Sequence, residues 1–254
     1  MSGSGKKNKK RKRRNRRIRK EIVLFSCVFI LALLILLIWK AFLGGRSHDS
    51  STHVIMLDAA HGGDASGYQG LISEDEYNEQ VISRLEVLLE EDSRFIPVRT
   101  HTADQAMSAA SRVEVINAEK PDLVLSVRCH NGDSPNFWAT LIFADPPSSK
   151  YHAESAAFAQ DVLASFTDAG VEAAAGYYYL RPIKEGYYQE HLVVLDDETV
   201  YEEETYDLMR ADASVVIVSQ INVNSSEETE FWASEEGIDK AAQIYYDAIV
   251  KRYE

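Results

Sequence analysis

The stretch Val54-Ile-Met-Leu-Asp-Ala-Ala-His-Gly-Gly63 starts with four consecutive apolar residues and ends in a histidine followed by two glycines. A short apolar run is typical of a buried β-strand, and glycines allow a tight turn directly after it. The pattern therefore predicts a strand over Val54–Leu57 and leaves His61 exposed at the end of that strand. Functional residues concentrate on such loops, so His61 is a candidate site residue.

Outward from this stretch, short apolar runs alternate with segments in which apolar residues recur at helical spacing, as in Val81, Leu85 and Leu89. This alternation is typical of an α/β fold. We expect an open, mainly parallel six-stranded sheet with helices on both faces, the last helix capped by Ser234. The predicted strands are Val54–Leu57, Phe95–Arg99, Leu123–Val127, Ala139–Phe143, Tyr177–Leu180 and Val215–Val218.

Residues 182–212 interrupt this alternation with several tyrosines among many acidic residues. The simpler interpretation is an acidic excursion on the surface. The alternative is a lid near a ligand site, because long loops at strand ends of open α/β sheets build binding surfaces.

The charge of the chain is unevenly distributed. Residues 1–40 hold 13 Lys and Arg against one acid, so they contribute +12 to the net charge of −13, and the rest contributes −25. Residues 22–39 contain no charged residue and are long enough for a membrane-spanning helix. Basic residues before this run place the N-terminus in the cytoplasm and the acidic body outside. An uncleaved anchor is favoured over a cleaved signal, which has a shorter apolar core.

These patterns divide the chain into a basic cytoplasmic tail (1–21), a transmembrane anchor (22–43), a linker (44–52) and an extracellular domain (53–254). The basic tail alone also matches a nuclear address or a nucleic-acid patch, but the adjacent apolar run favours the membrane, so no nucleic-acid partner is expected. With Cys27 in the anchor and Cys129 in the domain, no disulfide forms within the domain.

Glu74 lies thirteen residues after His61, just before the first predicted helix. Neutral imidazole and carboxylate are both suitable ligands for zinc. A lone His and Glu are nevertheless more often ordinary surface residues, so these two positions alone indicate a metal site only weakly.

A longer set of motifs follows the same order. The chain has Asp58-Ala-Ala-His61-Gly-Gly, Gly67, Glu74-x-x-x-Asn78, Arg112 with Asn117 five residues later, Pro121-Asp122-Leu-Val-Leu-Ser126, Asn224-Ser-Ser-Glu227-Glu228 and Ala233-Ser-Glu-Glu-Gly237-Ile-Asp-Lys-Ala-Ala242. Together, over residues 53–253, these motifs resemble the zinc-dependent N-acetylmuramoyl-L-alanine amidases. The resemblance implies hydrolysis, in peptidoglycan, of the amide between N-acetylmuramic acid and the first L-alanine of the stem peptide.

In that family two histidines and a glutamate hold zinc, and a second glutamate acts as the base. His61 and Glu74 match the first two ligands. Arg128 stands where the third ligand is expected, and a guanidinium has no lone pair for a metal. Ser219 stands at the position of the base, and a hydroxyl takes up no proton near neutral pH without help.

His130 lies two residues after Arg128 and points the same way in an extended segment, so His61, Glu74 and His130 are the candidate metal ligands. Alternatively, Arg128 replaces the ion and pairs with Glu74. Three functions remain open: a degenerate amidase that binds peptidoglycan or a wall-synthesis partner without cleavage, an active zinc amidase with a rearranged site, and a protein-interaction platform.

Overall fold

The computed structural model describes residues 52–131, 141–171 and 207–254, together with the backbone of four short strands between residues 178 and 202. The chain divides into two compact units, residues 1–49 and 50–254. The predicted tail and anchor, and the linker up to residue 51, lie outside the described residues. Within the described part, no helix is both long enough and apolar enough to cross a membrane.

One six-stranded sheet forms the centre of the unit that begins at residue 50, with the strand order β2-β1-β3-β9-β4-β5. The first four are parallel, whereas β4 runs antiparallel to β9 and β5 runs parallel to β4. The bounds are β1 His53–Ala59, β2 Phe95–Arg99, β3 Leu123–His130, β4 Leu141–Ala144, β5 Tyr178–Tyr179 and β9 Val215–Asn222. All six predicted strands are therefore present, and the sheet is mainly parallel.

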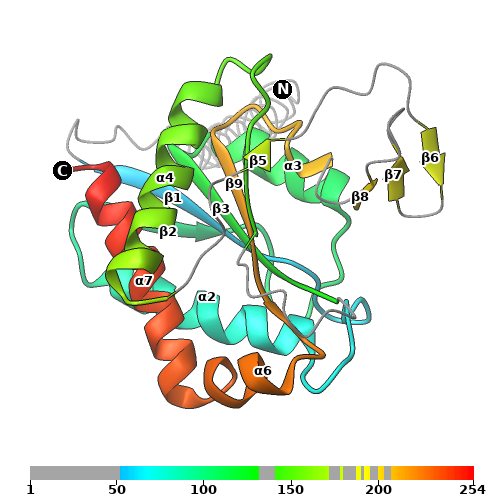
Figure 1. The fold of residues 1–254 in the computed structure, drawn as a ribbon. Coiled ribbons are helices and arrows are strands. Elements are labelled where there is room, and N and C mark those ends of the chain that lie inside the picture. Colours follow the sequence, from blue (N-terminus) through cyan, green and yellow to red (C-terminus); the bar gives the residue numbers. More distant parts are fainter. Residues whose placement is uncertain are drawn as a thin grey trace, which may run out of the picture. The chain divides into compact units, whose positions relative to one another are not determined.

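Helices cover both faces of this sheet (Figure 1). On one face, α7 (Glu235–Arg252) packs between α2 (Glu74–Glu90) and α4 (His152–Asp168), and the short α6 (Ser226–Trp232) precedes it. On the other face lie α3 (Ala109–Glu119) and the buried side chains of residues 208–213. Because β1, β3 and β9 are covered on both sides, their sequences are continuous apolar runs rather than alternating ones.

The cap predicted for the last helix is confirmed. The Ser234 hydroxyl accepts a hydrogen bond from the Gly237 amide at 3.1 Å. Acidic residues occupy the first turn of α7 and basic residues the last turn, which complements the helix dipole.

The segment 182–212 contains a separate antiparallel sheet of β6 (Tyr187–Gln189), β7 (Leu192–Val194) and β8 (Val200–Glu202). Its last residues belong to the core, since Leu208 and Met209 are buried against the α3 face of the main sheet. The interpretation of residues 182–212 as a surface excursion is therefore wrong for the last residues of the segment. Whether it acts as a lid stays a prediction.

Candidate functional site

A buried polar cluster supports the end of β1. The Asp58 carboxylate is inaccessible to solvent and accepts hydrogen bonds from Thr100 (2.6 Å), Arg112 (2.7 Å) and Ser126 (2.7 Å). Burial raises the pKa of Asp58, but the Arg112 charge and the two hydroxyl groups outweigh it and bring the pKa below its ordinary value. Asp58 is thus a stable carboxylate that joins β1 to β2, α3 and β3.

This cluster extends to the backbone of His61. Thr100 Oγ1 lies 2.8 Å from His101 Nδ1, and His101 Nε2 donates to the His61 carbonyl oxygen at 2.9 Å. His61 has a φ of 72°, a left-handed conformation that is uncommon outside glycine. The contact from His101 therefore helps to hold His61 in this left-handed turn.

Glu74 is fully buried at the first position of α2. Its Oε1 accepts from the Cys129 amide at 2.8 Å, and its Oε2 accepts from the Tyr68 amide at 2.8 Å. The same Oε2 lies 3.4 Å from His61 Nε2. The structure therefore brings His61 and Glu74 together, as the sequence predicts.

The backbone of Gly67 lies close to both side chains of the His61–Glu74 pair. It has a φ of 65°, and a Cβ added there would lie 2.5 Å from Glu74 Oε2 and 2.5 Å from His61 Cδ2. Any larger residue would have to displace both side chains, so the close backbone approach requires glycine.

Arg128 and Ser219 are register partners on the adjacent strands β3 and β9. Both are buried, Arg128 with 5% and Ser219 with 4% of its surface exposed. The Ser219 hydroxyl lies 3.0 Å from His130 Nδ1, and the strand register shifts between Arg128 and His130. The two sequence positions that depart from the amidase pattern, Arg128 and Ser219, thus lie side by side in the carboxyl-terminal halves of two parallel strands.

The charge of Arg128 acts on the other side chains of this site. Burial lowers the pKa of His61, which Glu74 opposes and Arg128 reinforces. Burial lowers the pKa of His130 to about 4, and Arg128 lowers it further. Burial also lowers the pKa of Arg128, against the attraction of Glu74. Both imidazoles are therefore neutral near pH 7.

Within the described ranges, no three His, Cys, Asp or Glu side chains are grouped so that they could hold a metal ion. His61 and Glu74 are in contact, and His130 is engaged with Ser219. The three-residue metal site of His61, Glu74 and His130 stays a prediction.

Sequence reasoning missed Thr100 and His101, and it noted Asp58, Arg112 and Ser126 as motif residues without a role. Thr100 and His101 directly follow the predicted strand Phe95–Arg99. Polar residues at the carboxyl end of a parallel strand were a usable signal. That they contact the His61 turn depends on β2 lying beside β1.

The fold and this site define an open α/β domain with a His–Glu pair at the carboxyl ends of parallel strands. The family model described as N-acetylmuramoyl-L-alanine amidase matches residues 55–251. The chain belongs to this family, whose members act on peptidoglycan and generally depend on zinc. None of the curated proteins compared with the chain matches it.

Solved amidase structures share the fold. The catalytic domain of CwlV from Bacillus (Paenibacillus) polymyxa var. colistinus is 19% identical, with a TM-score of 0.61 over 79% of this chain and 97% of that one. Ami1 from Mycobacterium smegmatis is 15% identical, with a TM-score of 0.64 over 81% and 99%. CwlD from Clostridioides difficile, solved in complex with the GerS lipoprotein, is 16% identical, with a TM-score of 0.61 over 79% and 98%.

Proposed function

We propose that residues 22–43 hold this chain in the cell membrane and that its amidase-family domain, facing outward, binds peptidoglycan without cleaving it. Family membership supports peptidoglycan as the ligand. The separation of a basic N-terminal tail from an acidic body by an uncharged apolar run supports the anchor and its orientation.

The observation that carries the loss of catalysis is the buried guanidinium of Arg128. It occupies the position that the resemblance assigns to the third zinc ligand, and its charge acts on His61 and Glu74. His61 and Glu74 by themselves fit zinc, because they offer a neutral imidazole and a carboxylate. Arg128 does not fit, since it offers no lone pair and would repel a cation beside it. The residues present therefore fit zinc poorly as a set.

Ser219, at the position of the catalytic base, also indicates a loss of catalysis. Ser219 offers a hydroxyl that is already within hydrogen-bond distance of His130 Nδ1. A hydroxyl of ordinary acidity does not accept a proton near neutral pH, as a general base must. The site thus lacks both the third ligand and the base that amide hydrolysis in this family requires, whereas the His61 turn and the buried Glu74 are retained.

Two measurements on the full chain in detergent test this proposal. Metal content is determined after dialysis, and purified peptidoglycan sacculi are used both for co-sedimentation and for release of stem peptide. The expected result is binding without stoichiometric zinc and without release. Stoichiometric zinc, or release that a chelator abolishes, contradicts the proposal.

The double substitution Arg128→His with Ser219→Glu provides the matched gain-of-function test. It restores an imidazole and a carboxylate at the two altered positions, so we expect zinc uptake and measurable release of stem peptide. Arg94→His, at a partly exposed arginine that pairs with Asp92, is the control for adding a histidine and should gain neither.

The alternative function is an active zinc amidase that uses His61, Glu74 and His130. Burial keeps His130 neutral, with a pKa of about 4, and this is the form that binds metals. Under this alternative His130→Ala abolishes both zinc binding and cleavage by the wild-type chain. Under the primary proposal the same substitution leaves a zinc-free, inactive protein that still binds sacculi.

A further inference from the structure

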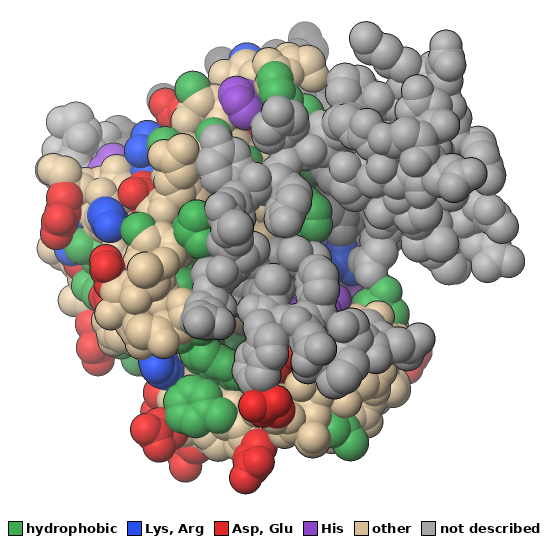
Figure 2. Space-filling model, in the orientation of Figure 1, with side chains coloured by type: hydrophobic (Ala, Val, Ile, Leu, Met, Phe, Trp, Pro, Cys, Tyr) green, Lys and Arg blue, Asp and Glu red, His purple; other side chains and the backbone are tan. Residues whose placement is uncertain are grey.

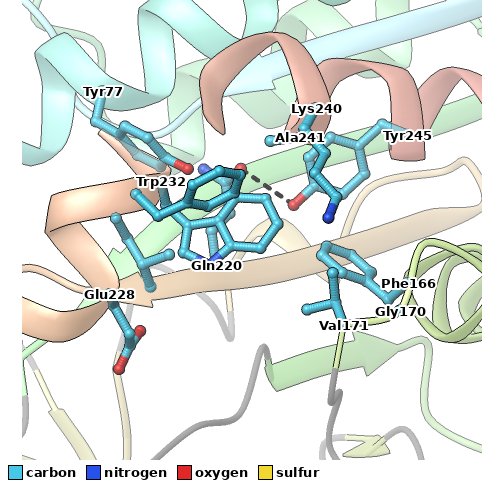
Figure 3. Close-up of a pocket in the computed structure, with 12 residues that line it drawn as sticks. Tyr77, Phe166, Gly170, Val171, Gln220, Glu228, Trp232, Lys240, Ala241 and Tyr245 are labelled. Atoms are coloured by element: carbon cyan, nitrogen blue, oxygen red, sulfur yellow. Dashed lines mark hydrogen bonds between the residues drawn. The ribbon is translucent and has the colours of Figure 1, made fainter. Parts of the chain in front are cut away.

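A cavity lies on the sheet face covered by α2, α4 and α7, and none of its lining residues belongs to the His61–Glu74 site. Its volume is about 370 Å³, within the range of cavities that bind small ligands or inserted side chains. Side chains from α2, α4, β9, α6 and α7 line it (Figure 3). The apolar part of the wall is mainly aromatic and includes Phe166, Ile221, Trp232 and Tyr245.

The hydroxyl group of Tyr77 points into this cavity (Figure 3). Tyr77 is only 2% exposed, and its hydroxyl has no hydrogen-bond partner among the described residues. Burial raises the pKa of Tyr77 well above its ordinary value, so the group remains a neutral donor. A buried hydroxyl without a partner is destabilising, and an acceptor brought by a ligand would remove that cost. Because the hydroxyl oxygen itself is inaccessible to solvent, a side chain of the wall must move to admit that acceptor.

Other polar groups of the wall already make hydrogen bonds, either to one another or to neighbouring residues. The Tyr245 hydroxyl donates to Gln220 Oε1 at 3.1 Å, and Gln220 Nε2 donates to Asn78 Oδ1 at 2.9 Å. Glu228 accepts from the Asn222 amide at 2.9 Å. Among the described residues that line the cavity, the Tyr77 hydroxyl is thus the buried side-chain group that still requires an oxygen or nitrogen acceptor.

The mouth of the cavity is apolar, with Lys240 at its edge and acidic side chains around it. Phe231 is 38% exposed, and Lys240 lies over the rings of Phe231 and Trp232 at 5.6 and 5.8 Å. Figure 2 shows hydrophobic side chains over α6 and the start of α7 with acidic side chains beside them. The exposed acids of α6 and of the start of α7 are Glu227, Glu230, Glu235, Glu236 and Asp239. Of these, Glu235 and Asp239 also pair with Arg84, at 3.6 and 3.0 Å.

We propose that this cavity is a docking site for a partner polypeptide that inserts a tyrosine-like side chain flanked by basic residues. The aromatic wall receives the ring, Tyr77 donates to its hydroxyl oxygen, and the acids of α6 and α7 attract the flanking cations. This site is separate from the His61–Glu74 pair, so the proposal holds whether or not the chain cleaves peptidoglycan.

The test uses the full chain in detergent with Trp39→Phe and Trp138→Phe, which leaves Trp232 as the sole tryptophan. Three peptides are titrated: acetyl-Lys-Tyr-Lys-amide, acetyl-Lys-Phe-Lys-amide and acetyl-Glu-Tyr-Glu-amide. Binding is followed by the fluorescence of Trp232, which is excited at a wavelength that tyrosine does not absorb. We expect saturable binding of the Lys-Tyr-Lys peptide. The Phe peptide should bind about 5- to 10-fold more weakly, which corresponds to one hydrogen bond. The acidic peptide should bind more weakly still, with a difference that shrinks as salt is added.

Substitutions assign the effect to the cavity. Tyr77→Phe removes only the unpartnered hydroxyl, so it should abolish the discrimination between the Tyr and Phe peptides while leaving the affinity for the Phe peptide unchanged. Phe231→Ala should weaken both Lys-flanked peptides. Val87→Ala, at another exposed apolar residue that does not line the cavity, is the control and should change neither affinity.

Several results would overturn the proposal. These are no saturable binding of the Lys-Tyr-Lys peptide, equal affinity for the acidic peptide at low salt, or unchanged Tyr-to-Phe discrimination in the Tyr77→Phe variant. A change in Trp232 emission with protein concentration and without peptide would identify a second copy of this chain as the occupant, and it would also reject the partner proposed.

Discussion

The substitution Asp58→Asn tests the physical basis of the site most directly. It keeps the shape of the side chain but removes the charge that faces Arg112, whose side chain is 1% exposed and whose guanidinium lies 2.7 Å from the carboxylate. Removing one partner of a buried ion pair typically costs about 3–5 kcal/mol, because a charge is left buried beside a neutral group. For a domain with a stability of roughly 5–15 kcal/mol, we expect a large drop in the urea midpoint.

The loss should depend on pH in a defined direction. Because the pKa of Asp58 in the folded protein is below its ordinary value, its stabilising contribution is present above that ordinary value and disappears as the pH falls through the folded value. The difference in unfolding free energy between wild type and Asp58→Asn should therefore be full at pH 7 and shrink in acid. Urea denaturation followed by circular dichroism at a series of pH values measures this.

A double-mutant cycle separates the ion pair from the general effects of substitution. Removing both charges in Asp58→Asn with Arg112→Met should cost less than the sum of the two single losses, by about 1–3 kcal/mol. Arg84→Ala, which breaks an exposed pair with Asp239, should hardly move the midpoint. A loss below about 1 kcal/mol for Asp58→Asn, or strict additivity in the cycle, would refute the view that this buried pair stabilises the domain.

Three further predictions concern other buried positions. Burial raises the pKa of Asp145 to about 6, so the contribution of this side chain to stability is most favourable below its ordinary pKa of 3.8 and is lost as the pH rises through about 6. Asp145→Asn should therefore stabilise the chain at pH 7.5, by no more than about 3 kcal/mol, and should lose this advantage below pH 4. Urea unfolding at both pH values measures the difference. Gly67→Ala should destabilise the chain by at least about 1–2 kcal/mol in the same assay, because its φ is positive and its Cβ would meet Glu74; an unchanged midpoint would contradict the close approach. In a Cys27→Ala background, Cys129 should react with a thiol reagent only on unfolding, since burial raises the pKa of its thiol well above the ordinary value; rapid reaction of the folded chain would show that Cys129 is accessible.

The alternation of apolar runs and helical spacing was sufficient to predict the α/β class and all six strands of the main sheet. Residues such as Leu125 and Val216 lie in continuous apolar runs, which are typical of strands buried on both faces. The spacing did not predict that β4 enters the sheet antiparallel to β9, because strand direction depends on how the intervening chain returns. Nor did it predict the small sheet of β6, β7 and β8, since these strands are only three residues long.

The sequence by itself determined which side chains are available at the site: His61 and Glu74 are present, whereas Arg128 and Ser219 stand where the amidase pattern has a ligand and a base. These are facts of chemical identity, and no fold can give a guanidinium a lone pair. Only the tertiary structure decided which groups meet. It placed His101 against the His61 carbonyl, brought the Cys129 and Tyr68 amides to Glu74, and left the Tyr77 hydroxyl in an aromatic cavity. These contacts join residues on different strands, helices and loops, and local sequence patterns carry no information about such distances before the sheet has assembled.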